Sequence, residues 1–263
     1  MTDCIVETTD GVMLIRFNRP ERLNAMGGTL LAELNDAFEQ GRQDDRVRAF
    51  VVTGEGRAWC AGADLMPDGF GAAGEANNPR SAALDAIGEV GRTVLNIYGA
   101  EKPTIAAVNG VCVGGGFGLC SAMDLRIASD QARFSTVFIK RALAPDCGLS
   151  WFLPRLIGPE KAAELFYSGR MVLADEALAL GIVSKVVPRD QLLATAVGFA
   201  RALAKQPPSA LTYTRRALQH SVTATLHDQL EFEWMNQKAC LASNEFQEGV
   251  AAFREKREPD FSH

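Results

Sequence analysis

The chain has 263 residues and a formal net charge of −5, and 47% of its residues are hydrophobic against 22% charged. A chain of this length buries roughly three quarters of the surface that it exposes when unfolded, so one large domain with a substantial core is expected. The negative net charge gives no general attraction for nucleic acid or for an anionic membrane, and neither is an expected partner.

The cysteines and histidines predict no metal site. Only three histidines occur, none forms HExxH, and the six cysteines contain no CxxC pair. Most of the cysteines lie in apolar stretches, where a free thiol behaves as a small hydrophobic group. The first residues, MTDCIVETTDG, lack the basic segment and apolar run of a secretory signal. We therefore expect a protein of the reducing cytoplasm.

The first half of the chain alternates between strand and helix patterns. Asp-Gly between two β-rich runs predicts a hairpin over 4–18. The elements expected after it are a helix over 25–45, a strand over 47–54, a loop over 66–80, a helix over 81–100, a strand over 102–110, a helix from 115 and a strand over 124–129. This alternation predicts an α/β fold with parallel strand pairing.

From about residue 158 the pattern is helical. Gly, Pro or Ser separates the six helices expected, at 159–169, 174–181, 189–206, 208–221, 224–243 and 244–257. We therefore expect two regions, a core over 1–200 that carries the functional site and a helical C-terminal region over 201–263.

A run of eleven residues, GVCVGGGFGLC at 110–120, contains five glycines and no charge. It does not fit the dinucleotide motif GxGxxG, because Leu119 stands where the third glycine is needed, and neither GxxxxGKS/T nor GxSxG occurs. A helix start offers free backbone N–H groups, and glycine there lets a ligand oxygen approach without meeting a Cβ atom. Close packing of a helix on a strand, with no ligand, is the alternative.

A second segment, AWCAGADL at 58–65, also follows a strand and offers small residues before a helix start that Asp64 could cap. The two segments together resemble the two signature segments of the enoyl-CoA hydratase/isomerase (crotonase) family. Other stretches are similar to that family in the same order: FNRPERLNAM at 17–26, APDCGLSWFLPRLIG at 144–158, ALALGIVSKVVP at 177–188 and AAFREKREPDF at 251–261. The resemblance covers essentially the whole chain.

The resemblance implies a crotonase (ClpP/crotonase-like) fold, in which a core of repeated ββα units is followed by a helical oligomerisation region. It also implies an acyl-CoA thioester as substrate, no cofactor beyond that CoA, and a homotrimer or homohexamer. In the family the thioester carbonyl lies between two backbone N–H groups, which by motif position are those of Ala61 and Gly115. Such donors stabilise the negative oxygen of an enolate.

Further site residues follow from the same resemblance. The positions that match CoA contacts are Arg22, Leu23, Ala25, Ala61, Gly62, Ala63, Asp64, Leu65, Gly115, Phe253 and Lys256. The last two match positions that reach the CoA of a neighbouring subunit, although basic charge at a helix end would explain Lys256 as well. Asp64 is expected to act as a cap rather than as a base.

The acid–base residues depart from the family hydratases. Their two glutamates fall here on Gly118 and Phe138, which cannot transfer protons. Asp146 stands where isomerases of the family that act on dienoyl-CoA, or on the ring-epoxide of phenylacetyl-CoA, carry a catalytic aspartate. One carboxylate in an apolar pocket suffices to move a double bond. A turn or helix-cap role is the alternative for Asp146.

Three functions stay open on the sequence alone. Double-bond isomerisation of an enoyl-CoA through an enolate, with Asp146 as the proton carrier, is the first hypothesis. Hydration of a 2-enoyl-CoA is the second. A catalytically silent acyl-CoA-binding protein is the third: the loss of both glutamates favours it, whereas Asp146 and the intact pair of N–H donors oppose it.

Overall fold

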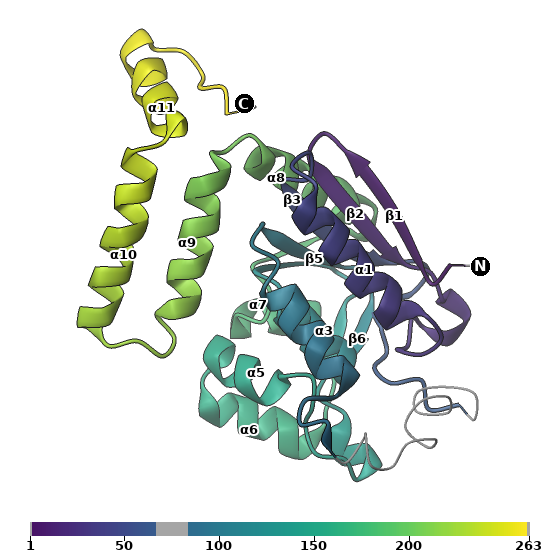
Figure 1. Cartoon of the computed structure of the whole chain (residues 1–263). Coiled ribbons are helices and arrows are strands. Elements are labelled where there is room, and N and C mark those ends of the chain that lie inside the picture. The colour runs from purple at the N-terminus through teal and green to yellow at the C-terminus, as the bar shows by residue number, and fades with distance from the viewer. Residues whose placement is uncertain (1, 67–83, 262–263) are drawn as a thin grey trace.

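The computed structural model describes residues 2–66 and 84–261. Within these residues two sheets form the centre of the molecule (Figure 1). The six-stranded sheet has, in spatial order, β1 (Cys4–Thr9), β2 (Val12–Phe17), β3 (Ala49–Gly54), β5 (Thr104–Val108), β7 (Leu125–Ser129) and β10 (Lys185–Val187). The four-stranded sheet has β4 (Ala58–Cys60), β6 (Val111–Val113), β8 (Arg133–Ser135) and β9 (Val172–Leu173).

The expected N-terminal hairpin is confirmed. β1 and β2 pair antiparallel, with Thr9 opposite Val12, so only Asp10 and Gly11 form the loop. Both loop residues have positive φ, 52° and 78°, as a turn that matches the twist of the strands requires. From β2 onward the neighbouring strands of the larger sheet are all parallel, which also confirms the expected pairing.

Helices cover both faces of the larger sheet. Helix α8 (Leu192–Ala204) buries Leu192, Ala196 and Ala200 against one face. On the other face lie α1 (Leu30–Gln43) and α3 (Gly88–Tyr98), whose apolar sides join the main core. The leucines of α1 and Phe38 that were expected on one helical face are buried, so the helix pattern was correct there.

The smaller sheet positions helix α4 (Gly115–Ser121). β4, β6 and β8 run parallel, so their carboxyl ends lie at the same edge of the sheet. The chain leaves β6 at Val113 and enters α4 within two residues, and every residue of α4 is buried. Helix α5 (Leu149–Ile157) packs on α4, and α6 (Pro159–Ser168) and α7 (Ala174–Leu180) follow. The glycine run therefore lies at a buried strand-to-helix junction.

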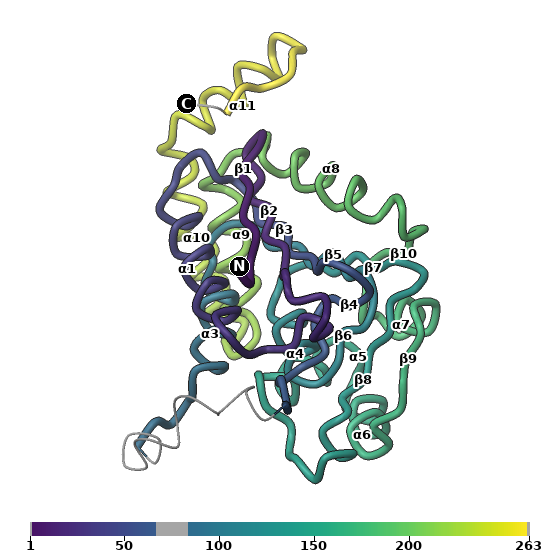
Figure 2. Tube along the Cα trace, turned by 90° about the vertical axis from the view of Figure 1, so that its right-hand side faces the viewer, coloured from purple at the N-terminus to yellow at the C-terminus, as the bar shows by residue number. Residues whose placement is uncertain are grey.

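The last three helices project from this body, and we call them the C-terminal arm: α9 (Pro208–His220), α10 (Leu226–Leu241) and α11 (Asn244–Glu255). Figure 1 shows α10 and α11 beyond the sheets and their covering helices, and Figure 2 shows α11 at one end of the molecule. No residue of α10 is buried. Among the described residues, no helix is both long enough and apolar enough to cross a membrane.

Some elements differ from expectation. The sequence did not predict strands β4, β6, β8, β9 and β10, because each of them is only two or three residues long. It also did not predict helix α5. Of the expected helix over 81–100, residues 81–83 lie outside the described residues and α3 covers Gly88–Tyr98, and most of the expected loop over 66–80 also lies outside them. The expected boundary at residue 200 falls inside α8, whereas the arm starts at Pro208.

Candidate active site

The two segments that carry the predicted CoA contacts lie side by side. Met26 and Ala63 form a parallel bridge, in which the Met26 N–H donates to the Gly62 carbonyl at 2.7 Å. The Asp64 N–H donates to the Met26 carbonyl at 2.9 Å. Residues 22–26 and residues 61–64 therefore form one continuous wall.

This hydrogen-bond pattern corrects the choice of one oxyanion donor. The Ala61 N–H donates to the Leu23 carbonyl at 3.1 Å, so it is not free for a ligand. In an extended segment successive N–H groups point to opposite sides. The Asp64 N–H is bonded toward Met26, so the N–H of its neighbour Ala63 points the other way. Gly62, with φ 87°, interrupts the alternation between Ala61 and Ala63. Ala63, two residues further along, therefore offers the free amide.

The second predicted donor is the amide of Gly115. Gly115 is the first residue of α4, and the first N–H groups of a helix have no acceptor within it. Within residues 2–66 and 84–261 no hydrogen bond of the Gly115 N–H is found. A Cβ atom on Gly62 would lie 3.5 Å from this nitrogen, so the neighbour of Ala63 directly faces it. Two amides from separate segments thus meet at the start of α4.

The glycines at this junction allow close backbone approach. Gly114 has φ 56° and ψ −129°, a conformation that residues with a Cβ rarely adopt. A Cβ atom on Gly116 would overlap the Cys60 carbonyl oxygen and lie 2.8 Å from the Cys60 Cβ. Tight packing between α4 and β4 therefore accounts for Gly116, whereas the free amide of Gly115 is the feature that can serve a ligand.

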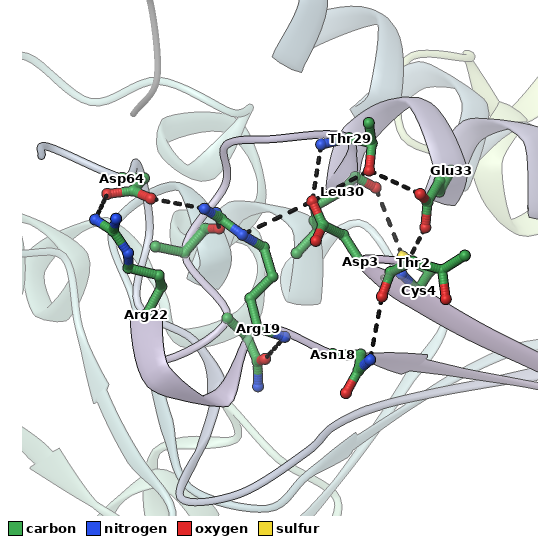
Figure 3. Close-up of polar contacts among 12 residues, drawn as sticks. Thr2, Asp3, Cys4, Asn18, Arg19, Arg22, Thr29, Leu30, Glu33 and Asp64 are labelled. Carbon is green, nitrogen blue, oxygen red and sulfur yellow. Dashed lines mark hydrogen bonds and ion pairs between the residues drawn. The ribbon is translucent and has the colours of Figure 1, made fainter. Parts of the chain in front are cut away.

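A charged cluster holds the two segments together (Figure 3). Arg19 donates to the Asp64 carboxylate at 2.9 Å and to the Ala25 carbonyl at 2.6 Å, and its Nε lies 3.7 Å from the Asp3 carboxylate. Arg22 lies 3.7 Å from the other oxygen of Asp64. The Asp64 side chain is only 4% exposed and is committed to two arginines. It also accepts the Met66 N–H at 3.2 Å, so a local capping role rather than a base is supported.

The remaining predicted CoA contacts fall into two groups. Ala25 is buried, whereas Leu23 and Arg22 are half-buried and Leu65 is exposed, all at the wall just described. Phe253, 85% exposed, and Lys256 lie at the end of α11, on the far side of the arm from α4 (Figures 1 and 2). One chain therefore does not bring these two residues to its own Gly115.

Asp146 lies in the loop that leads into α5 and is exposed, not enclosed in an apolar pocket as the sequence reasoning expected. Its carbonyl accepts the Leu149 N–H at 3.0 Å, which closes a turn through Cys147 and Gly148. The N-cap of α5 is Gly148, and no side chain caps this helix. The turn interpretation of Asp146 is thus confirmed for its backbone, while the helix-cap interpretation of its side chain is wrong.

The two positions of the missing glutamates differ in what surrounds them. Phe138 is 6% exposed and belongs to the main core. A Cβ atom on Gly118 would overlap the Cβ of Cys147 and lie 2.6 Å from the Cys147 carbonyl oxygen. The loop that carries Asp146 thus occupies the space that a side chain at position 118 would need.

Several thiols surround α4, but none is activated. Burial raises the pKa of Cys60 to about 12 and raises the pKa of Cys112 well above its ordinary value. Burial is the main cause that raises the pKa of Cys147. The negative charge of the neighbouring Asp146 raises this pKa further. These thiols stay protonated at neutral pH and are poor nucleophiles. No group of three or more metal-ligating side chains is found in the described part of the chain.

Aromatic residues line an apolar cavity beside the Asp146 loop. It has a volume of about 270 Å³ and is lined by Val94, Leu95, Tyr98, Gly148, Trp151 and Phe152. Of the three tryptophans, Trp151 lines this cavity, Trp59 is fully buried in the core, and Trp234 is 57% exposed on α10.

Sequence reasoning missed two residues of this site, Arg19 and Cys147, and the role of a third, Ala63, which it expected only as a CoA contact. The Ala63 amide became apparent only from the direction of its neighbours' hydrogen bonds. Arg19 lies within the quoted stretch FNRPERLNAM, but the sequence gives no sign that it bridges to Asp64. Cys147 follows Asp146 directly, and only the fold shows that it packs on Gly115 and Gly118.

Comparison with known proteins agrees with this geometry. The family model for enoyl-CoA hydratase/isomerase matches residues 7–263. A 1,2-epoxyphenylacetyl-CoA isomerase of Escherichia coli is 36% identical, over 96% of this chain and 95% of the relative. A 4-chlorobenzoyl coenzyme A dehalogenase of an Arthrobacter species is also 36% identical, over 95% and 90%. The crystal structure of an enoyl-CoA hydratase from Bacillus anthracis superposes with a TM-score of 0.91 at 32% identity, covering 99% of each chain.

Proposed function

Because the chain belongs to the enoyl-CoA hydratase/isomerase family and has the crotonase fold, we propose that it isomerises the double bond of an enoyl-CoA. The observation that carries this proposal is the meeting of two free amides, of Ala63 and Gly115, beside a loop that bears one carboxylate, Asp146. The relative named as an isomerase supports the choice of activity.

The proposed reaction begins when the thioester oxygen of a 3-enoyl-CoA accepts hydrogen bonds from the Ala63 and Gly115 amides. The Asp146 carboxylate removes a proton from C2, and the electron pair of the broken C–H bond spreads through a dienolate onto that oxygen. The protonated Asp146 returns the proton to C4, so the double bond moves to C2–C3 and the carboxylate is regenerated. Each fixed donor lowers the barrier by roughly 3 kcal/mol.

Hydration is the weaker alternative. Adding water to a 2-enoyl-CoA in the manner of the family hydratases takes two carboxylates, whereas Gly118 and Phe138 carry none and the packing at Gly118 leaves no space for a side chain. Asp146 alone supplies one acid–base group, which suffices to carry one proton between two carbons. The exposure of Asp146 in the isolated chain is consistent with a site that substrate covers.

A second candidate activity rests on the relative named as a dehalogenase. A carboxylate beside an acyl group can attack carbon as a nucleophile instead of removing a proton. The same residue, Asp146, would then displace a halide from an aryl-CoA. The experiment below separates the two activities.

CoA and subunit contacts complete the proposal. CoA would follow the wall made by residues 22–26 and 61–65, where Arg22 is half-buried beside Asp64. The arm would pair with other copies of the chain in a homotrimer or homohexamer. Phe253 and Lys256 would thereby reach the CoA of a neighbouring copy, because α11, at whose end they lie, is well away from α4 within one chain (Figure 2).

The test uses three substrates and one matched pair of variants. Wild-type protein should convert a 3-enoyl-CoA, raising the absorbance of the conjugated thioester, and should not bleach a 2-enoyl-CoA. Asp146→Asn should slow isomerisation at least about a hundredfold, because the proton carrier is lost. Asp130→Asn is the control, since Asp130 is an exposed carboxylate in the turn between β7 and β8, at the amino end of β8.

Other outcomes would assign other functions. Loss of absorbance from the 2-enoyl-CoA would indicate a hydratase. Chloride release from 4-chlorobenzoyl-CoA without double-bond migration would indicate the nucleophilic activity. Tight binding of acyl-CoA with no turnover of any of the three would favour a silent binding protein.

A further inference from the structure

The Arg19 side chain lies between the two segments that form the wall of the site (Figure 3). Its Nη1–H donates to the Ala25 carbonyl at 2.6 Å, and its Nη2–H donates to the Asp64 carboxylate at 2.9 Å. Its Nε lies 3.7 Å from the Asp3 carboxylate, and the side chain is only 12% exposed. Because a guanidinium is planar and its donors have fixed directions, these contacts hold Ala25 and Asp64 at set positions relative to each other.

The Asp64 carboxylate depends on Arg19 for its place in the structure. It is only 4% exposed, and the Arg22 Nη1 lies 3.7 Å from it, further away than the Arg19 Nη2. The Met66 N–H also donates to it, at 3.2 Å. A buried carboxylate that loses a paired cation either turns toward water or takes up a proton. Loss of Arg19 should therefore move the Asp64 side chain and the backbone to which it is attached.

The segment that Arg19 holds contains the amide proposed as an oxyanion donor. The Gly62 carbonyl and the Ala63 N–H belong to one trans peptide unit, so they point in opposite directions. The Gly62 carbonyl accepts the Met26 N–H at 2.7 Å, which turns the Ala63 N–H away from Met26. The two residues that Arg19 holds flank this bond, one directly before Met26 and the other directly after Ala63.

From these contacts we propose that Arg19 is a positioning residue, which fixes the direction of the Ala63 amide by holding Asp64 against Ala25. Arg19 acts through the backbone rather than on the substrate. An oxyanion donor contributes its full effect only when it is fixed in advance toward the oxygen, and a small rotation lowers that contribution. The catalytic consequence rests on the proposed function, whereas the effect of Arg19 on this peptide unit does not.

The first experiment tests the effect on the backbone without substrate. Residue-resolved hydrogen exchange is measured on the full-length protein and on Arg19→Gln. The amides of Met26 and Asp64, which join the two segments, should exchange at least about tenfold faster in the variant, because their hydrogen bonds open more often. The amides of β5 should keep their rates, since the change is local. Unchanged exchange at Met26 and Asp64, or equal acceleration in β5, would overturn the proposal.

Arg16→Gln is the matched control. Arg16 lies on β2, its side chain is 21% exposed, and it pairs with Glu7 at 2.8 Å and with Glu55 at 3.2 Å. The control thus also removes an arginine with two ion pairs, but the partners of this arginine lie outside the wall. Exchange at the two amides that join the segments should stay at the wild-type rate. Acceleration there as large as in Arg19→Gln would refute a specific role for Arg19.

The second experiment measures the catalytic consequence by a double-mutant cycle. Arg19→Gln should lower kcat roughly tenfold and change KM less than about threefold, because the donor is misdirected rather than removed. In an Asp64→Asn background the carboxylate that Arg19 holds is already gone, so the same change should lower kcat less than about threefold. Arg16→Gln should keep the wild-type kcat. Additive effects of Arg19→Gln and Asp64→Asn would contradict the positioning role.

The bound ligand reports the direction of the donor as well. Infrared difference spectroscopy follows the C=O stretch of a saturated acyl-CoA with an isotope-labelled thioester carbonyl. Wild-type protein should lower this frequency relative to the free ligand, and Arg19→Gln should bring it part of the way back. A merely structural role would reduce the bound fraction and leave its frequency unchanged. If the wild-type protein isomerises no substrate, the proposed function fails, while hydrogen exchange still decides whether Arg19 holds the Ala63 peptide.

Discussion

Gly118 is the residue at which this chain separates from a two-glutamate hydratase. A side chain there would collide with the Cβ and the carbonyl of Cys147. The missing glutamate is therefore part of a changed packing arrangement rather than a single substitution. Restoring the acid alone would displace the loop that carries Asp146.

Substitution of this glycine should be costly even for the smallest side chain. We predict that Gly118→Ala lowers the free energy of unfolding by roughly 1 to 3 kcal/mol, because α4 and the 146–148 loop must separate. Gly198→Ala is the matched control, since Gly198 lies in α8 and a Cβ atom there meets nothing within 4 Å. That change should be neutral or stabilising by up to about 1 kcal/mol. Chemical denaturation measures both, and equal effects would contradict the packing argument.

At the residue scale the sequence predicted the kind of site better than its exact donors. The glycine run and Asp146 could be found from spacing and from resemblance to the family. The amide of Ala61 was the wrong choice, because which of two alanines has a free N–H depends on bonds to residues 23–26. Such bond directions follow from strand pairing between distant segments, which no local pattern encodes.

Among the elements, α9 is fastened to the body by an ion pair whose arginine is buried. The Arg215 side chain, 7% exposed, donates its Nε–H to both oxygens of Asp124 at 2.9 Å and an Nη2–H to the Ile97 carbonyl at 3.3 Å. Asp124 also accepts the backbone N–H and the hydroxyl of Thr104. The arm is therefore tied to the amino ends of β5 and β7 and to α3.

Breaking this pair should cost far more than breaking its neighbour. We predict that Arg215→Ala lowers the free energy of unfolding by roughly 2 to 3 kcal/mol, because Asp124 loses its partner. Arg216 pairs with Glu101 at the surface, and Arg216→Ala should cost less than about 1 kcal/mol. Denaturant midpoints of the two variants give the comparison. A cost for Arg216→Ala as large as that for Arg215→Ala would show that burial does not decide the effect.

Long elements were predictable and short ones were not. The hairpin, α1 and the C-terminal helices carry enough periodic residues to be read from the sequence. β4, β6 and β8 have three residues each, too few for an alternating pattern, yet they build the edge from which α4 starts. The second sheet thus escaped prediction because its order comes from pairing between segments far apart in the chain.

For the whole molecule, the arm presents more apolar surface than a monomer ordinarily tolerates. Leu226, Leu230, Trp234 and Met235 on α10 are each more than half exposed. Large exposed apolar surfaces of this kind mark contacts with other chains. The proposed trimer or hexamer would cover them.

We predict that sedimentation at micromolar concentration gives a species of at least three 28.4-kDa chains. Met235→Glu should shift it toward the monomer, because a charge would be buried in the contact. Tyr167→Glu replaces a similarly exposed side chain on α6 and should leave the assembly unchanged. A wild-type monomer at this concentration would exclude the arm as an oligomerisation region.

The central claim is that Asp146 moves a proton while the Ala63 and Gly115 amides hold the enolate oxygen. Deuterium exchange at C2 of a bound acyl-CoA in heavy water measures that step directly, even where no net reaction follows. Wild-type protein should incorporate deuterium, and Asp146→Asn should do so at least about a hundredfold more slowly while binding the same ligand equally well. Exchange at the wild-type rate in Asp146→Asn would contradict the account.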